Sequence, residues 1–229
     1  MIQGFPVVRK AIERTIRLVS TARLRPPVLE DLVSVELLSA LEEIEGATSG
    51  RLNGQWYGTS GVDASEFVYN VPHANFINAS FCYAKPRSPN RFNGEDRGAW
   101  YAALEVETCF AEIKYHVTRE LENIGEFKTR IEFAEMFASF AGDFLDLCAG
   151  DGAHDCLHAD PGVGYPAGNA IANAARAEGI NLITYPSVRH EGGTCFAALS
   201  PNAVQSVAQG AVWSMQWYGA PEPEVSPVK

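Results

Sequence analysis

The sequence predicts a mixed α/β fold. Segments with apolar residues at helical spacing occur in the same chain as short β-rich segments bounded by glycine and proline. Hydrophobic residues make up 46% of the 229 residues and charged residues 20%, close to globular averages, so the chain can form a sizeable core. We expect an N-terminal helical segment and loop (residues 1–66) that packs on or belongs to the same domain, a core (67–219) and a disordered tail (220–229).

The N-terminal segment is predicted to be helical. Residues 6–19 and 28–45 carry apolar residues at helical spacing, and the second of these segments follows Pro26-Pro27. Residues 49–66 are rich in Gly, Ser, Asn and Asp, which is typical of a loop.

Strands and helices alternate in the remainder. Residues 129–147 fit a helix or strands equally, and both assignments stay open. The other predicted elements are a strand at 98–104, a helix at 108–121, a helix at 167–178 that ends at Gly179, and strands at 181–185, 194–199 and 211–218.

Arg91, Tyr101 and Glu112 are the first candidates for a functional site. They are 10 and 11 residues apart, too far for one helix face, so they meet only if the chain folds back. Together they offer three groups that suit a nucleotide site: an arginine to hold an anion, an aromatic ring, and a carboxylate. Each also has a structural explanation: an arginine bonded to carbonyls, a packed tyrosine, and a glutamate that interacts with the helix dipole near a helix start.

Glu112 and His116 lie four residues apart, on the side opposite the apolar stripe of the helix at 108–121. If that side faces a cleft, Glu112 can supply negative charge to an electron-deficient sugar carbon. The role of His116 stays open.

Ser187 is a further candidate, in the loop PSVRHEGG. No G-x-S-x-G motif surrounds it, which favours a serine that bonds to the local turn over a nucleophile. The cluster HDCLH at 154–158 does not have the spacing of a known metal motif, and neither a dinucleotide-binding nor a P-loop glycine motif is present. We therefore expect no metal.

Composition excludes several classes of protein. The net charge of −10 argues against direct binding of nucleic acid, although the first 25 residues are basic. No apolar run approaches the length of a membrane span and no secretory signal is evident, so we expect a cytosolic protein with no membrane contact. The five cysteines are odd in number and never spaced C-x-x-C, which indicates reduced thiols.

Four segments together resemble the RES family, the toxins of bacterial Xre-RES toxin-antitoxin pairs. The resemblance extends over most of the chain. In one segment, 43–52, Ser49-Gly50 stands where the family commonly has Asn-Pro, so Arg51 receives no role. The segments are IRLVSTARLRPPVLEDL (16–32), EIEGATSGRL (43–52), NRFNGEDRGAWYAALEVETCFAEIKYH (90–116) and GINLITYPSVRHEGGTCFAAL (179–199).

The resemblance implies an ADP-ribosyltransferase-like domain, with a β-sandwich core surrounded by helices, that acts on NAD+. In that scheme Glu112 stabilises the sugar cation, and Tyr101 packs against nicotinamide or its ribose. Ser187 orients the nicotinamide side, and Arg91 and Arg17 grip the diphosphate. Arg14 and Arg23 compete with Arg17 for the position of the family's first arginine.

The resemblance also implies an inhibitory Xre-type antitoxin as partner. The expected reaction is cleavage of NAD+ at the nicotinamide-ribose bond, with transfer of ADP-ribose to water or phosphate. The alternatives are ADP-ribosylation of a cellular protein, a domain that binds NAD+ without cleaving it, and a non-catalytic interaction module.

Overall fold

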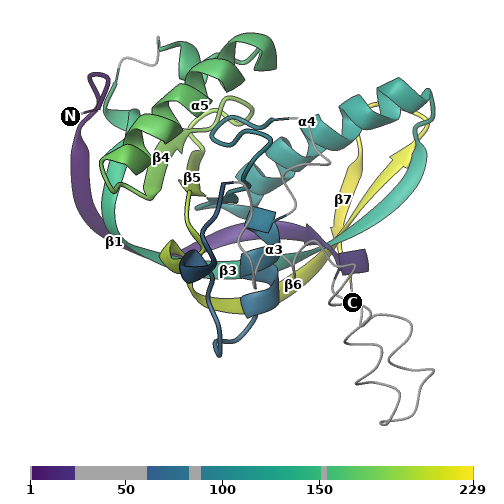
Figure 1. Ribbon diagram of the computed structural model, residues 1–229. Helices are drawn as coiled ribbons and strands as arrows, with labels where there is room; N and C mark the ends of the chain where they lie inside the picture. The colour runs from purple at the N-terminus through teal and green to yellow at the C-terminus, as the bar shows by residue number, and fades with distance from the viewer. Residues whose placement is uncertain (1, 24–60, 83–88, 151–153, 229) are drawn as a thin grey trace.

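The computed structural model describes residues 2–23, 61–82, 89–150 and 154–228 (Figure 1). Within these ranges a seven-stranded mixed sheet has the strand order β1-β2-β5-β4-β3-β6-β7. This confirms the predicted mixed α/β class. The strands are β1 (Val7–Ser20), β2 (Trp100–Ala103), β3 (Lys128–Asp146), β4 (Leu182–Pro186), β5 (Thr194–Ala198), β6 (Gln205–Tyr218) and β7 (Glu224–Pro227), and the α-helices are α3 (Ala74–Cys82), α4 (Val106–Ile124) and α5 (Pro161–Ala177).

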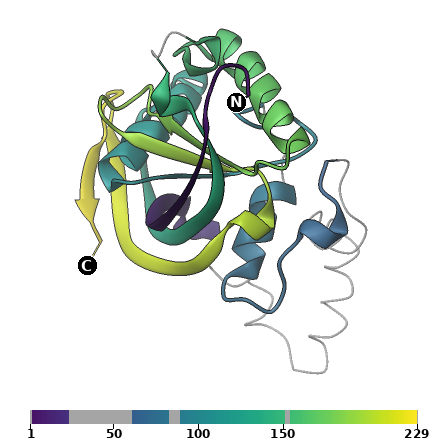
Figure 2. The ribbon, with the colours of Figure 1, turned by 90° about the vertical axis from the view of Figure 1, so that its left-hand side faces the viewer.

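The sheet curls on itself. β1 pairs with β3 along most of its length and also meets β2 at Ile16 and Ala103, so β1, β2, β5, β4 and β3 form a closed ring of strands. Figure 2 shows β6 (yellow-green) bending through a wide arc in the same body. The β core expected from the family resemblance thus takes the form of one strongly curved sheet.

Helices cover the two sides of the sheet. Buried residues of α4 and α5 belong to one hydrophobic cluster, and buried residues of α3 belong to a second. β3 contributes to both clusters, with Phe133 in the first and Met136 in the second. A strand with both faces buried has no alternating pattern, which explains why residues 129–147 fitted helix and strand equally well.

The prediction of a helix at 6–19 was wrong, because these residues form β1. The segment contains several β-branched residues, and its pairing with β3 overrides the helical spacing of its apolar positions. Pairing with β6 also orders part of the tail that we expected to be disordered, since Glu224–Pro227 form β7. The predicted helix at 28–45 and most of the loop at 49–66 lie outside the described residues.

The remaining elements agree with the sequence. β2 lies within the strand predicted at 98–104, and α4 and β6 cover their predicted segments. β4 and β5 match the strands predicted at 181–185 and 194–199, and they pair as an antiparallel hairpin. α5 begins earlier than predicted, at Pro161, with Asp160 accepting a hydrogen bond from the amide of Gly162. Gly179 follows α5 with φ +75°, as expected of a glycine after a helix. No helix in the described ranges combines the length and apolar character needed to cross a bilayer.

Candidate functional site

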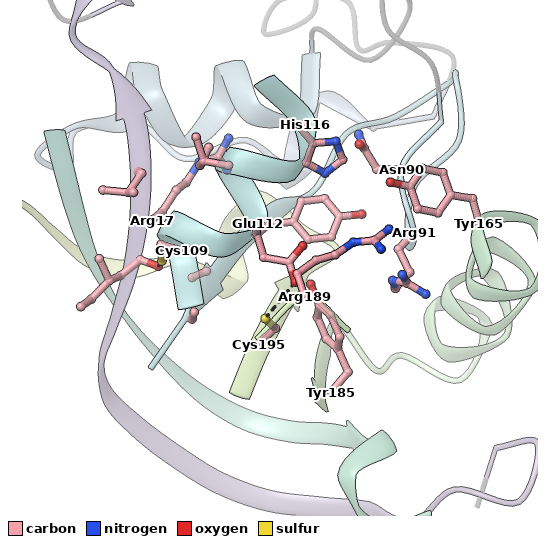
Figure 3. Close-up of a pocket in the computed structure, with 16 residues that line it drawn as sticks. Arg17, Asn90, Arg91, Cys109, Glu112, His116, Tyr165, Tyr185, Arg189 and Cys195 are labelled. Carbon is pink, nitrogen blue, oxygen red and sulfur yellow. Dashed lines mark hydrogen bonds between the residues drawn. The ribbon is translucent and has the colours of Figure 1, made fainter. Parts of the chain in front are cut away.

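A cavity of about 230 Å³ opens beside α4 (Figure 3). Its walls come from β1, β2, α4, α5, the turn that contains Asn90 and Arg91, and the β4–β5 hairpin. Four of the five predicted site residues line it, namely Arg17, Arg91, Tyr101 and Glu112. The chain therefore folds back so that Arg91, Tyr101 and Glu112 meet at one cavity, as their spacing required.

Ser187, the fifth predicted residue, contacts Glu112 directly. Its Oγ donates a hydrogen bond of 2.7 Å to Oε1 of Glu112. The same Oγ accepts hydrogen bonds from the backbone amides of Arg189 and His190, at 3.1 and 3.0 Å. Cys195 Sγ lies 4.0 Å from the same carboxylate oxygen. Ser187 therefore orders its own turn and orients Glu112.

The position of Glu112 on α4 argues against a role in helix capping. The acidic residue in the first turn of α4 is Glu107, whereas Glu112 lies beyond that turn, where the helix dipole has little effect. Glu112 and His116 both line the cavity. The helix side opposite the apolar stripe thus faces a cavity at these two residues.

Tyr101 builds one wall of the site. Its ring lines the cavity, while the neighbouring Trp100 is buried in the cluster on the other side of the sheet. The hydroxyl of Tyr101 accepts a hydrogen bond from the amide of Phe92 and donates one to Oδ1 of Asn93, both at 2.9 Å. Burial raises the pKa of Tyr101 far above its ordinary value, so the hydroxyl stays protonated. Tyr101 therefore also holds the turn that carries Arg91.

Arg91 is both a structural residue and a cavity residue. Its Nη1 donates to the carbonyl oxygens of Cys156 and His158, the second at 3.0 Å, and its side chain is almost fully buried. Its guanidinium carbon lies 5.7 Å from the centre of the Tyr165 ring. Arg91 therefore has the structural role considered above, an arginine bonded to carbonyls, and its side chain also lines the cavity.

Arg17 lies on β1 and lines the cavity. Its guanidinium lies over the Trp100 ring, 4.7 Å from the ring centre. Arg14 is exposed and packs on Phe137 instead, and the side chain of Arg23 lies outside the described residues. In Figure 3, Arg17 is on one side of Glu112 and Arg91 on the other. Both arginines line the same cavity, and their expected joint grip on one diphosphate stays a prediction.

The structure adds cavity residues that received no role from the sequence. The most notable is Arg189, which lines the cavity and lies two residues after Ser187 in the same loop. Its position two residues after Ser187 was the one feature of the sequence that could have indicated a place in the site. Tyr165, Tyr185, Cys109, Cys195 and Asn90 also line the cavity.

Charge and burial shift the protonation of several lining groups. The pKa of His116 is lowered, first by partial desolvation and then by the positive charges of Arg189, Arg119 and Arg91. Burial raises the pKa of the Cys109 thiol to about 12 and also raises the pKa of Cys195. His116 is therefore mainly neutral and both thiols are protonated at neutral pH.

The residues of HDCLH bond to the backbone. Nδ1 of His154 accepts from the amide of Cys156 at 3.1 Å, and Nδ1 of His158 accepts from the amide of Asp160 at 3.0 Å. In the part of the chain that the structure describes, no cluster of three or more His, Cys, Asp or Glu side chains could hold a metal ion. These rings act as caps for short turns.

The cavity is positively charged in an acidic protein. Among the residues that the structure describes, its charged lining side chains are three arginines, Arg17, Arg91 and Arg189, and one carboxylate, Glu112. The whole chain carries a net charge of −10. A cavity with this excess of positive charge suits an anionic ligand, and the carboxylate of Glu112 is held in one orientation by Ser187.

Comparison with known proteins identifies the family. No curated protein matches the chain. A chain in the crystal structure of the M. tuberculosis MbcT-MbcA toxin-antitoxin complex resembles it with a TM-score of 0.38 and 10% sequence identity, over 89% of this chain and 86% of that chain. The model of the RES domain matches residues 67–218, which is more than half of the chain. The chain therefore belongs to the RES domain family.

Proposed function

We propose that this protein is the toxin of a toxin-antitoxin pair and that it cleaves NAD+ at the nicotinamide-ribose bond. The observation that carries the proposal is the cavity in which Ser187 orients Glu112 among three arginines. Membership of the RES domain family supports it. The cavity of about 230 Å³ is below the usual range of ligand pockets, roughly 300–1,000 Å³, so it has room for only part of a dinucleotide.

The chemistry fits the residues present. When the bond between the ribose carbon and nicotinamide breaks, its electron pair moves to the ring nitrogen and neutralises the pyridinium. The sugar becomes a cation that resembles an oxocarbenium ion, and the carboxylate of Glu112 stabilises it or holds a ribose hydroxyl. Ser187 keeps Oε1 of Glu112 in place, and Tyr101 supplies an aromatic wall for nicotinamide or its ribose.

The acceptor completes the reaction. A water or phosphate oxygen bonds to the sugar carbon, and the water proton passes to solvent. The products are nicotinamide with ADP-ribose or with its phosphate ester. Transfer to a side chain of a cellular protein is the alternative outcome of the same cleavage.

The partner follows from the family resemblance. We propose that an Xre-type antitoxin binds this toxin in the bacterial cytoplasm and blocks the cavity. Co-purification with the product of the neighbouring reading frame, and loss of NAD+ cleavage in the complex, are the expected results.

The central test is release of nicotinamide from NAD+ by the purified protein, in buffer, with phosphate and with cell lysate. Mass spectrometry of the products separates hydrolysis, phosphorolysis and protein modification. Glu112→Gln should lower the rate by about 100-fold or more, because it removes the charge that stabilises the sugar cation. Glu120→Gln, an exposed position on the same helix, is the matched control and should keep full activity.

Two results would contradict the proposal. Absence of nicotinamide release with all three acceptors would exclude the enzyme. Full activity of a folded Glu112→Gln variant would remove Glu112 from the chemistry. If NAD+ binds in calorimetry but nicotinamide is never released, the cavity is a binding site without catalysis.

A further inference from the structure

Arg189 belongs to the cavity but has no part in the scheme above. It lies in the β4–β5 loop, two residues after Ser187, and its side chain lines the cavity together with that of Arg91. In Figure 3, Arg91 and Arg189 lie on the same side of Glu112, near Tyr165, whereas Arg17 lies on the other side.

Neutral groups hold the Arg189 guanidinium in one place. Nη2 donates to the carbonyl oxygen of Ala159 at 2.6 Å, and the guanidinium carbon lies 3.5 Å from the centre of the Tyr115 ring. Arg91 is held in the same manner, by the carbonyls of Cys156 and His158. One short segment, 156–159, thus fixes two guanidinium groups through three carbonyl oxygens.

Within the described part of the chain, no carboxylate pairs with either of these two arginines. Among the described residues neither Arg91 nor Arg189 forms an ion pair, although five other basic side chains do. Their hydrogen bonds to carbonyls use Nη1 of Arg91 and Nη2 of Arg189 and leave further N–H groups on both side chains. Two fixed cations with free donors at one wall of a cavity favour an anion there.

The state of His116 is consistent with this positive field. Its pKa is lowered by desolvation and then by the charges of Arg189, Arg119 and Arg91, while Glu120 acts in the opposite direction. A neutral imidazole adds no further repulsion at the same end of the cavity and can accept or donate a hydrogen bond.

We infer that Arg189 and Arg91 together form a diphosphate subsite on the α5 side of the cavity. Two adjacent guanidinium groups match two adjacent phosphates better than one phosphate, because each planar group can hold its own oxygens. Arg17, on the other side of Glu112, lies outside this subsite. The inference deepens the proposed function, on which its assignment to NAD+ rests, and orients the dinucleotide with its diphosphate toward α5 and its nicotinamide ribose at Glu112.

Binding of ADP-ribose tests the subsite without catalysis. Calorimetry should give a dissociation constant about 10- to 100-fold higher for Arg189→Gln than for the wild type, since a hydrogen bond to a charged group contributes roughly 1.5–3 kcal/mol. Arg189→Lys keeps the charge but loses the planar donors, and should show an intermediate loss. Thermal unfolding of each variant checks that the fold is intact.

Arg119→Gln is the matched control. Arg119 also contacts Tyr115, with its Nη1 3.2 Å from the tyrosine hydroxyl, and its charge also acts on His116. Arg119 is exposed and does not line the cavity. Its removal should leave the affinity for ADP-ribose within about twofold, which separates a specific contact from a general loss of positive charge.

A second measurement uses the wild-type protein alone. A diphosphate bound beside Arg91 and Arg189 raises the pKa of His116, because a nearby anion favours the charged imidazole. An NMR titration of His116 should therefore shift to higher pH when pyrophosphate or ADP-ribose is added, and should not shift with adenosine.

The possible outcomes are distinct. Equal affinity of wild type and folded Arg189→Gln, or an equal loss in Arg119→Gln, would overturn the subsite. An unchanged His116 titration with pyrophosphate and ADP-ribose would do the same. If the subsite binds ADP-ribose but the wild type never cleaves NAD+, the proposed reaction fails while the subsite stands. If the wild type cleaves NAD+ and Arg189→Gln binds ADP-ribose with normal affinity, the subsite fails while the proposed reaction stands.

Discussion

At the scale of single residues, most side chains of the site do more than one thing. Ser187 donates a hydrogen bond to Glu112 and accepts hydrogen bonds from two backbone amides of its own loop. Tyr101 lines the cavity and holds the turn that contains Phe92 and Asn93. Arg91 lines the cavity and binds carbonyl oxygens within and just after η4 (Asp155–Leu157). Loss of activity in a variant of such a residue therefore needs a measurement of stability beside it.

Tyr101→Phe separates the two roles of the tyrosine. The variant keeps the aromatic wall but removes the hydroxyl that accepts from the amide of Phe92 and donates to Oδ1 of Asn93. We expect a decrease of about 1–3 kcal/mol in the free energy of unfolding, measured by urea denaturation. Unchanged stability with a large loss of activity would assign the hydroxyl to the chemistry instead.

His116 should make stability depend on pH. Its pKa in the folded protein is lowered from the ordinary value of 6.5, mainly by desolvation. Between the folded pKa and 6.5 the unfolded chain binds more protons than the folded one, so stability falls as the pH falls through this range. His116→Gln should flatten this part of the curve of unfolding free energy against pH. If the curve of the variant equals that of the wild type, His116 has the same pKa in the folded and the unfolded protein.

At the scale of elements, the site depends on a close approach between α5 and the turn that carries Arg91. Gly168 of α5 lies against the backbone of this turn, where an added Cβ would overlap the carbonyl oxygen of Arg91. Gly164 lies against His158 and the Arg91 side chain, where a Cβ would be 2.5 Å from the His158 carbonyl oxygen and 2.8 Å from Nη1 of Arg91. These glycines allow the helix to form one wall of the cavity.

Gly168→Ala should therefore destabilise the protein, although alanine favours a helix over glycine by about 1 kcal/mol. We expect a net loss of roughly 1–3 kcal/mol, because the helix must move away from the turn, and weaker binding of ADP-ribose. Gly162→Ala is the control, since its Cβ would meet only the Asp160 side chain, at 3.3 Å. Equal melting temperatures for the two variants would contradict the close packing.

At the scale of the whole molecule, the sheet unites distant parts of the sequence. β1 brings Arg17 to a cavity whose other walls lie after residue 89, and its pairing with β2 and β3 closes the ring of strands. The match to the RES domain begins only at residue 67. The structural unit therefore extends beyond the matched segment.

A fragment of residues 61–229 should fail to fold. It lacks β1, whose removal would expose the edges of β2 and β3 and the surfaces that cover Ile16, Leu18 and Val19. A fragment of residues 1–223 is the control, because the β7 residues that it lacks are exposed. Circular dichroism and thermal unfolding measure both. A cooperative transition in the first fragment would show that β1 is not required.

The sequence by itself predicted the fold class, the strands that became β4 and β5, and α4, and the resemblance to the RES family supplied the five candidate site residues. The elements depend on local spacing and on glycine and proline positions, and the candidate residues depend on motifs that stand in several segments of the chain. Tertiary structure alone decided that residues 7–20 are a strand, that β3 is buried on both faces, and that Arg189 joins the cavity. The physical reason is that pairing and burial come from partners far along the chain, and these outweigh the weak local preference of a segment.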